Sequence, residues 1–152
     1  MKTVQQLASV LLCLSSLTFF SLFVNASEEK DNDDVSRTFD QLIKAVQSRV
    51  SSDRRIDAAQ KLSDLVHTCR SELFSERHIA QLSALLQDEN DSVRYWSATA
   101  LGYLGPRARS AIPALEKALE ERADDLTSKS SRSAIRLALQ RIRTESHEDV
   151  TS

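Results

Sequence analysis

One apolar pattern recurs along this chain at a spacing of 38 to 39 residues, and it constrains the fold more than any other feature. In its most regular occurrence, Val93, Leu101 and Leu104 project to one side of a helix, with small residues among them. Repetition at this spacing is typical of stacked helical hairpins, each of which needs its neighbours to bury its apolar stripe. The repeated positions are Ala58, Ala59, Leu62 and Leu65, then Ser97, Ala98, Leu101 and Leu104, then Ala138, Leu139 and Ile142.

Breaks between the helical stripes divide the pattern into hairpins. Gly105 followed by Pro106 is a combination that ends one helix and begins the next. Apolar spacing from Phe39 onward predicts a first helix over residues 35–50, and Ser52-Asp53 is expected to cap the second helix. We therefore expect three hairpins over about 35–70, 75–105 and 106–143, with a longer turn around residues 121–129 before the last helix.

The stretch from Ile79 to Leu119 resembles a HEAT repeat of the short type found in phycobilisome-lyase-like and many bacterial proteins. The resemblance is weak outside this stretch. It implies an all-α fold, a short right-handed α-solenoid of about three HEAT-like helical hairpins. The alternative is an irregular helical bundle with coincidental repeats. The residues that carry the resemblance are Leu82, Leu85, Leu86, Asp88, Val93, Arg94, Ala98, Ala100, Leu101, Gly102, Gly105, Ile112, Pro113 and Leu115.

The N-terminus has the pattern of a secretory signal peptide over residues 1–26. Lys2 supplies positive charge, the run from Leu7 to Val24 is apolar apart from serine and threonine, and small residues precede Ser27. We expect an exported protein, periplasmic or secreted, with no stable membrane span once the signal is removed. The alternative is a retained signal anchor, since the apolar run is near the minimum length for a spanning helix.

The segments that flank the repeat domain (35–143) are polar. Residues 27–34 are acidic and are expected to form a flexible leader, and residues 144–152 a disordered tail. After residue 26 the net charge is 19 − 22 = −3, which argues against a nucleic-acid partner held by bulk charge. Cys13 would leave with the signal peptide, so Cys69 would stand alone, and we expect it to be buried.

Arginines at matching repeat positions are candidates for a structural role. The resemblance to HEAT arrays implies that the arginine near the start of each second helix ties adjacent repeats, together with an aspartate of the preceding turn. The alternative is that these arginines form an anion-binding ladder. The predicted structural set is Arg55, Asp88, Asp91, Arg94 and Arg132.

The most informative surface is the side of each second helix that faces away from the core. Tyr95, Thr99 and Tyr103 are spaced i, i+4, i+8 opposite the apolar stripe, and aromatic and arginine side chains are enriched in binding hot spots. In a HEAT-like solenoid the second helices line the concave surface, where Lys61 and Arg136 would border the site. The alternative is that the tyrosines and Trp96 pack against the neighbouring repeat. The predicted partner-binding residues are Ile56, Tyr95, Trp96, Tyr103, Leu137 and Arg141.

No motif indicates chemistry. His67, Cys69 and His78 lack the paired spacing of metal ligands, and the sequence has no nucleophile elbow, phosphate loop or HExxH segment. We therefore expect no metal, no cofactor and no enzyme, but an interaction module or scaffold for another protein or peptide. Two alternatives stay open: a bilin lyase-like enzyme, which the resemblance raises, and a structural cell-envelope component that self-associates.

Overall fold

The computed structural model describes residues 32–48, 51–121 and 129–144. The expected signal peptide, the leader up to residue 31, the turn over 122–128 and the tail from residue 145 lie outside these residues. Contacts divide the chain into a unit of Met1–Val35 and a unit of Ser36–Ser152, and the helical core belongs to the second unit.

Six α-helices make up most of the described chain, and no strand occurs in its described residues. Two short 3-10 segments, η1 (Ser71–Leu73) and η2 (Gly105–Ala111), connect the hairpins. The α-helices are a first helix over residues 32–47, α2 (Ser52–Thr68), α3 (Glu76–Leu85), α4 (Asp91–Leu104), α5 (Ile112–Glu121) and α6 (Lys129–Thr144).

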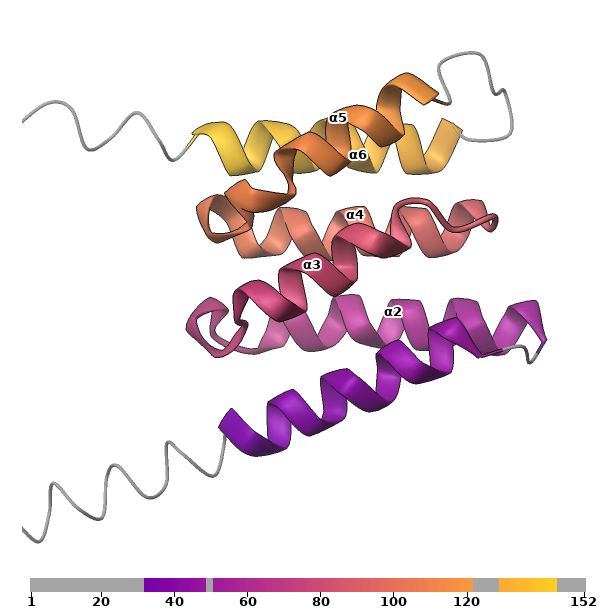
Figure 1. Ribbon diagram of the computed structural model, residues 1–152, viewed down its shortest axis with the longest axis vertical. Helices are drawn as coiled ribbons and strands as arrows, with labels where there is room; N and C mark the ends of the chain where they lie inside the picture. The colour runs from indigo at the N-terminus through magenta and orange to yellow at the C-terminus, as the bar shows by residue number, and fades with distance from the viewer. Residues whose placement is uncertain (1–31, 49–50, 122–128, 145–152) are drawn as a thin grey trace, which may run out of the picture. The chain divides into compact units, whose positions relative to one another are not determined.

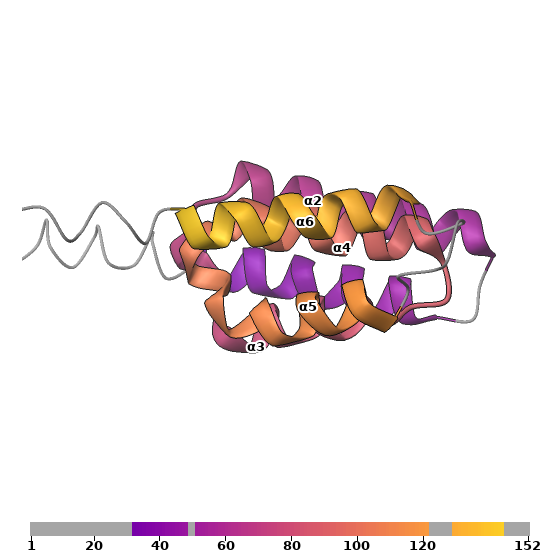
Figure 2. The ribbon, with the colours of Figure 1, turned by 90° about the horizontal axis from the view of Figure 1, so that it is seen from above.

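The helices of the second unit pack in two layers (Figures 1 and 2). The second helices of the three hairpins, α2, α4 and α6, lie side by side in one layer, and α4 contacts both of its neighbours. The first helix, α3 and α5 form the other layer. The prediction of an all-α solenoid is confirmed by this stack of hairpins.

Equivalent leucines hold equivalent places in the stack. Leu62, Leu101 and Leu139 lie on α2, α4 and α6 and are 1%, 0% and 6% exposed. The small residues Ser97 and Ala98, which precede Leu101, are also buried, so the helices approach closely at this level. The apolar repeat in the sequence therefore corresponds to one continuous core that runs through the three hairpins.

An aromatic cluster fills the core between the first and second hairpins. The rings of Phe39 and Phe74 lie 5.9 Å apart, and the ring of Phe39 lies 4.5 Å from that of His78. Both phenylalanines are fully buried. Phe74 comes from the connection after η1, outside any helical stripe, so apolar periodicity does not detect it.

Several helix ends differ from the expected ones. The first helix is already formed at residue 32, where the described residues begin, and it ends at residue 47 rather than at the expected residue 50. Ser52 and Asp53 are already inside α2, and Ser51, with an extended backbone, occupies the cap position. The carbonyl of Ser51 accepts hydrogen bonds from the backbone N–H groups of Arg54 and Arg55, so the cap lies one residue before the expected Ser52. After Gly105 the chain passes through η2 before α5 begins at Ile112.

Candidate functional site

The turn between α3 and α4 is built around a buried arginine. The side chain of Arg94 is 2% exposed, and its guanidinium donates to the carbonyls of Asp88 and Glu89 at 2.8 and 2.9 Å. It also pairs with the carboxylate of Asp91 at 2.9 Å. Asn90 caps α4 by accepting a hydrogen bond from the backbone N–H of Ser92. Arg94 thereby holds the turn together through two of its carbonyls and one carboxylate.

Other side chains connect this turn to the first hairpin. Arg55 forms an ion pair with Asp88 and a second with Glu89 at 3.2 Å. The same guanidinium donates to the carbonyl of Val46 at 2.8 Å, at the end of the first helix. Asn90 donates to the hydroxyl of Ser52 at 2.7 Å. Arg55 therefore joins two repeats.

The third hairpin is connected to the second through a serine. The hydroxyl of Ser131 donates to Asp91 at 2.6 Å, the carboxylate that also pairs with Arg94. Arg132 is half-buried and forms no ion pair with the described residues. At the second junction a hydroxyl of α6 thus shares the Asp91 carboxylate with Arg94.

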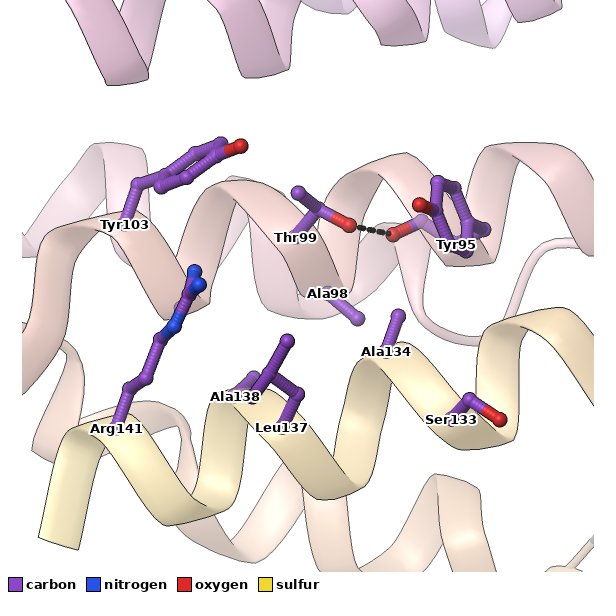
Figure 3. Close-up of a pocket in the computed structure, with 10 residues that line it drawn as sticks. Tyr95, Ala98, Thr99, Tyr103, Ser133, Ala134, Leu137, Ala138 and Arg141 are labelled. Atoms are coloured by element: carbon purple, nitrogen blue, oxygen red, sulfur yellow. Dashed lines mark hydrogen bonds between the residues drawn. The ribbon is translucent and has the colours of Figure 1, made fainter.

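A groove with a volume of about 260 Å³ lies between α4 and α6. It opens on the face of the two helices that is turned away from the core, and Figure 3 shows the side chains that line it. The larger lining residues from α4 are Tyr95, Thr99 and Tyr103, and those from α6 are Leu137 and Arg141.

Small residues form the floor of this groove and bring the two helices together. Ala98 and Gly102 of α4 face Ala134 and Ala138 of α6. A Cβ atom placed on Gly102 would lie only 3.2 Å from the Cα of Ala138, closer than most real Cβ contacts. The helices therefore touch along their alanine and glycine surfaces, and the longer side chains on either side stand up as walls.

Tyr103 lies where side chains of all three hairpins meet. It is 39% exposed, and the ring of His67 on α2 lies 4.3 Å from its ring. The guanidinium carbon of Arg141 on α6 lies 5.5 Å from the centre of the same ring, a cation–π distance. Leu137, next to Arg141 along the groove, is 46% exposed. The repeat pattern does not predict this stacking. The residue of α2 that is equivalent to Tyr103 is Asp64, whereas the ring that contacts Tyr103 belongs to His67.

The groove gathers four of the six residues expected to bind a partner, namely Tyr95, Tyr103, Leu137 and Arg141. Ile56 is half-buried on α2 and does not line the groove. Trp96 is half-buried, packs edge-to-face against the ring of Tyr95 at 4.9 Å, and lines a separate hollow beside Asp91. The groove between α4 and α6 thus includes four of the six predicted residues, and the other two lie outside its lining.

Cys69 is half-exposed, so the expectation that it is buried is wrong. It sits at the C-cap of α2, where the backbone turns to an extended conformation and leaves the helix. The side chain consequently does not follow the buried stripe of the helix.

No arrangement of side chains in the described part of the chain points to catalysis. Within residues 32–48, 51–121 and 129–144, no group of three or more His, Cys, Asp or Glu side chains could hold a metal ion. No helix of these segments is long and apolar enough to cross a bilayer. Burial lowers the pKa of His78, and perturbed pKa values often occur at functional sites. The Nδ1 of His78, however, accepts a hydrogen bond from the backbone N–H of Ser75 and so caps a helix.

Comparison with known proteins supplies a family match. A family model described as HEAT repeats matches residues 39–136, nearly two thirds of the chain. The comparisons with curated proteins and with solved structures gave no significant match. The matched range includes helices of all three hairpins.

Proposed function

The chain belongs to the HEAT repeat family, and from this premise we propose that it is a non-enzymatic scaffold that binds another protein or a peptide. Helical-repeat arrays use their extended surfaces for binding. The groove between α4 and α6 is the binding surface in this proposal. The observation that carries it is the joint exposure of Tyr103 and Leu137 in one groove with Arg141.

The composition and the rigidity of the groove support a protein partner. Tyrosine and arginine are enriched at binding hot spots, and a leucine that is nearly half exposed gains free energy when a partner covers it. The side chains that form the walls of the groove belong to two packed helices, so the protein loses little conformational entropy when a partner binds. A volume of about 260 Å³ is below the roughly 300–1,000 Å³ of typical small-molecule sites. This size favours one or two side chains inserted from a larger protein surface.

The test is a pull-down that uses the mature chain as bait in an extract of the compartment where the protein resides. It compares wild type with the paired substitution Tyr95→Ala and Tyr103→Ala in the groove. We expect the partner recovered with wild type to fall at least tenfold, because the two rings form the α4 wall. The melting temperature should change by only a few degrees, since both side chains are partly exposed. Quantitative mass spectrometry of the captured proteins and circular dichroism give the two measurements.

The matched control is Lys117→Ala with Glu120→Ala on α5, two exposed side chains on the other layer. This control should capture the same partner as wild type. Unchanged capture by the tyrosine variant would remove the groove as the binding surface. A large fall in its melting temperature would instead identify the tyrosines as packing residues.

We propose in addition that the protein is exported and that its signal peptide is cleaved after Ala26. The charged start, the apolar run and the small residues before Ser27 support this proposal. Intact mass measurement of protein from its own cells should give a chain that begins at Ser27. A chain that retains residues 1–26 would indicate a membrane anchor and would remove the proposal.

A further inference from the structure

The helix that supplies one wall of the groove is basic. Helix α6 carries five basic residues and no acidic residue over its whole length, Lys129 to Thr144. On the other wall, α4, the only charged residues are Asp91 and Arg94, which pair with each other. Among the residues that line the groove, the charged one is Arg141 of α6.

The basic residues of α6 differ in their availability. Arg143 forms an ion pair with Glu116 of α5, and Arg132 is half-buried. Arg136 and Arg141 are exposed, and neither has a carboxylate partner among the residues that the structure describes. Arg141 reaches from α6 toward α4 beside Tyr103 (Figure 3). Its guanidinium thus presents free donors at the mouth of the groove, where an ion pair is partly shielded from water.

Charges on α2 limit where an acidic partner can lie. Asp57 and Asp64 are exposed on this helix, and Lys61 is already paired with Asp57 at 2.8 Å. An acidic segment placed over α2 would meet these carboxylates, whereas over α4 and α6 it would meet Arg141 and Arg136. Helix α2 thus carries charges of both signs, exposed Arg54 among them, whereas α6 carries positive charge only.

We propose that the groove binds a peptide segment of a partner protein that presents an acidic side chain two positions from a large apolar one. This inference rests on the proposed function and specifies its partner. The carboxylate pairs with the guanidinium of Arg141, and the apolar side chain packs on Leu137.

The spacing within this motif follows from helix geometry. Leu137 and Arg141 are four residues apart on α6, which corresponds to about 6 Å along the helix axis. An extended chain covers about 6.6 Å in two residues, and those two side chains point to the same side. An extended segment with the pattern apolar-x-acidic therefore matches the two contacts simultaneously.

The experiment selects peptides from a phage-displayed library of random 12-residue sequences on the immobilised purified protein. We expect enrichment of sequences that contain a large apolar residue and Asp or Glu two positions apart. The binding of a selected peptide, measured by fluorescence polarisation, should weaken at least tenfold with Arg141→Glu. It should also weaken severalfold between 50 and 500 mM salt, because the ion pair is partly exposed.

A charge exchange provides the matched control. Replacing the acidic residue of the selected peptide by lysine should abolish binding to wild type and restore binding to the Arg141→Glu variant. The control variant Arg143→Glu changes a basic residue of the same helix that is already paired outside the groove, and it should leave the affinity within about threefold of wild type.

The outcomes separate this inference from the proposed function. Enriched peptides that are neutral or basic, with binding that depends on Leu137 but not on Arg141, would overturn the acidic motif and leave the binding groove intact. Binding that is insensitive to both Leu137→Ser and Arg141→Glu, or no enrichment at all, would overturn the groove together with the motif. Restoration by the exchanged charges would support both.

Discussion

His78 completes the capping box of α3 with its own ring, at the position where a capping box ordinarily has glutamate or glutamine. Its Nδ1 accepts a hydrogen bond of 3.2 Å from the backbone N–H of Ser75, and its Nε2 lies 3.3 Å from the hydroxyl of Ser36. The ring is buried beside Phe39. Burial lowers the pKa of His78 below its ordinary value of 6.5, while the carboxylate of Asp40 opposes the shift. A neutral imidazole is therefore part of the folded state.

This histidine makes stability depend on pH. In the unfolded chain His78 takes up a proton near pH 6.5, whereas the folded chain resists protonation until a lower pH. The stabilisation is fully present above about pH 6.5 and is lost as the pH falls toward the lowered folded pKa. We expect His78→Gln, which keeps an acceptor for Ser75, to reduce the fall in unfolding free energy between pH 7 and 5. Urea denaturation at both values measures this, and an unchanged fall would contradict it.

Arg55 and Arg94 occupy equivalent positions in two repeats but contact different groups. The 39-residue spacing places both near the start of a second helix, and this much could be read from the sequence. Which carbonyls and carboxylates each guanidinium meets depends on how the preceding turn folds back. At the first junction the guanidinium of Arg55 pairs with the carboxylate of Asp88. At the second junction the carboxylate of Asp91 accepts hydrogen bonds from both Arg94 and Ser131.

At the scale of the elements, Gly105 sets the direction in which the chain leaves α4. Its backbone has φ 55° and ψ −137°, a conformation that is accessible almost exclusively to glycine. Pro106 follows and begins η2, which carries the chain to the start of α5 at Ile112. The Gly-Pro pair predicted a break between helices, but the length of the 3-10 segment depends on packing of the buried Ala108 and Ala111.

Substitution of this glycine should weaken the junction. We expect Gly105→Ala to lower the free energy of unfolding by about 1–3 kcal/mol, because a Cβ atom at this φ and ψ strains the backbone. Chemical denaturation measures the effect. The control is Arg107→Ala, at an exposed position of the same segment, which should change stability by less than about 1 kcal/mol. A Gly105→Ala variant as stable as wild type would show that the turn adopts another conformation in solution.

Helix ends were less predictable than helix interiors. The first helix ends three residues before its expected limit, and α2 begins at a residue expected to cap it. Apolar periodicity depends on many residues of a helix, whereas an end depends on one or two local hydrogen bonds. Serines at positions 51 and 52 are chemically equivalent candidates for a cap, and only the backbone conformation distinguishes them.

For the whole molecule, the stack predicts that the middle hairpin contributes most to stability. Helix α4 has a second helix on each side, whereas α6 has one described neighbour in its layer. We expect Leu101→Ala to cost about 3–5 kcal/mol and Leu139→Ala about 2 kcal/mol, both within the range for buried leucines. Each variant should still unfold in one transition, as stacked repeats do when their interfaces couple them. Equal costs measured by urea denaturation would contradict this gradient.

The sequence alone determined the helical content, the hairpin repeat and the buried leucines, because each follows from a periodicity carried by many residues. It also placed Tyr95, Tyr103, Leu137 and Arg141 on the sides of second helices that face away from the core, since helical spacing alone places a side chain on a face. Only the tertiary structure decided that these four share one groove. That outcome depends on the close approach of α4 to α6 at Gly102 and Ala138, a distance between helices that no pattern within a single helix contains.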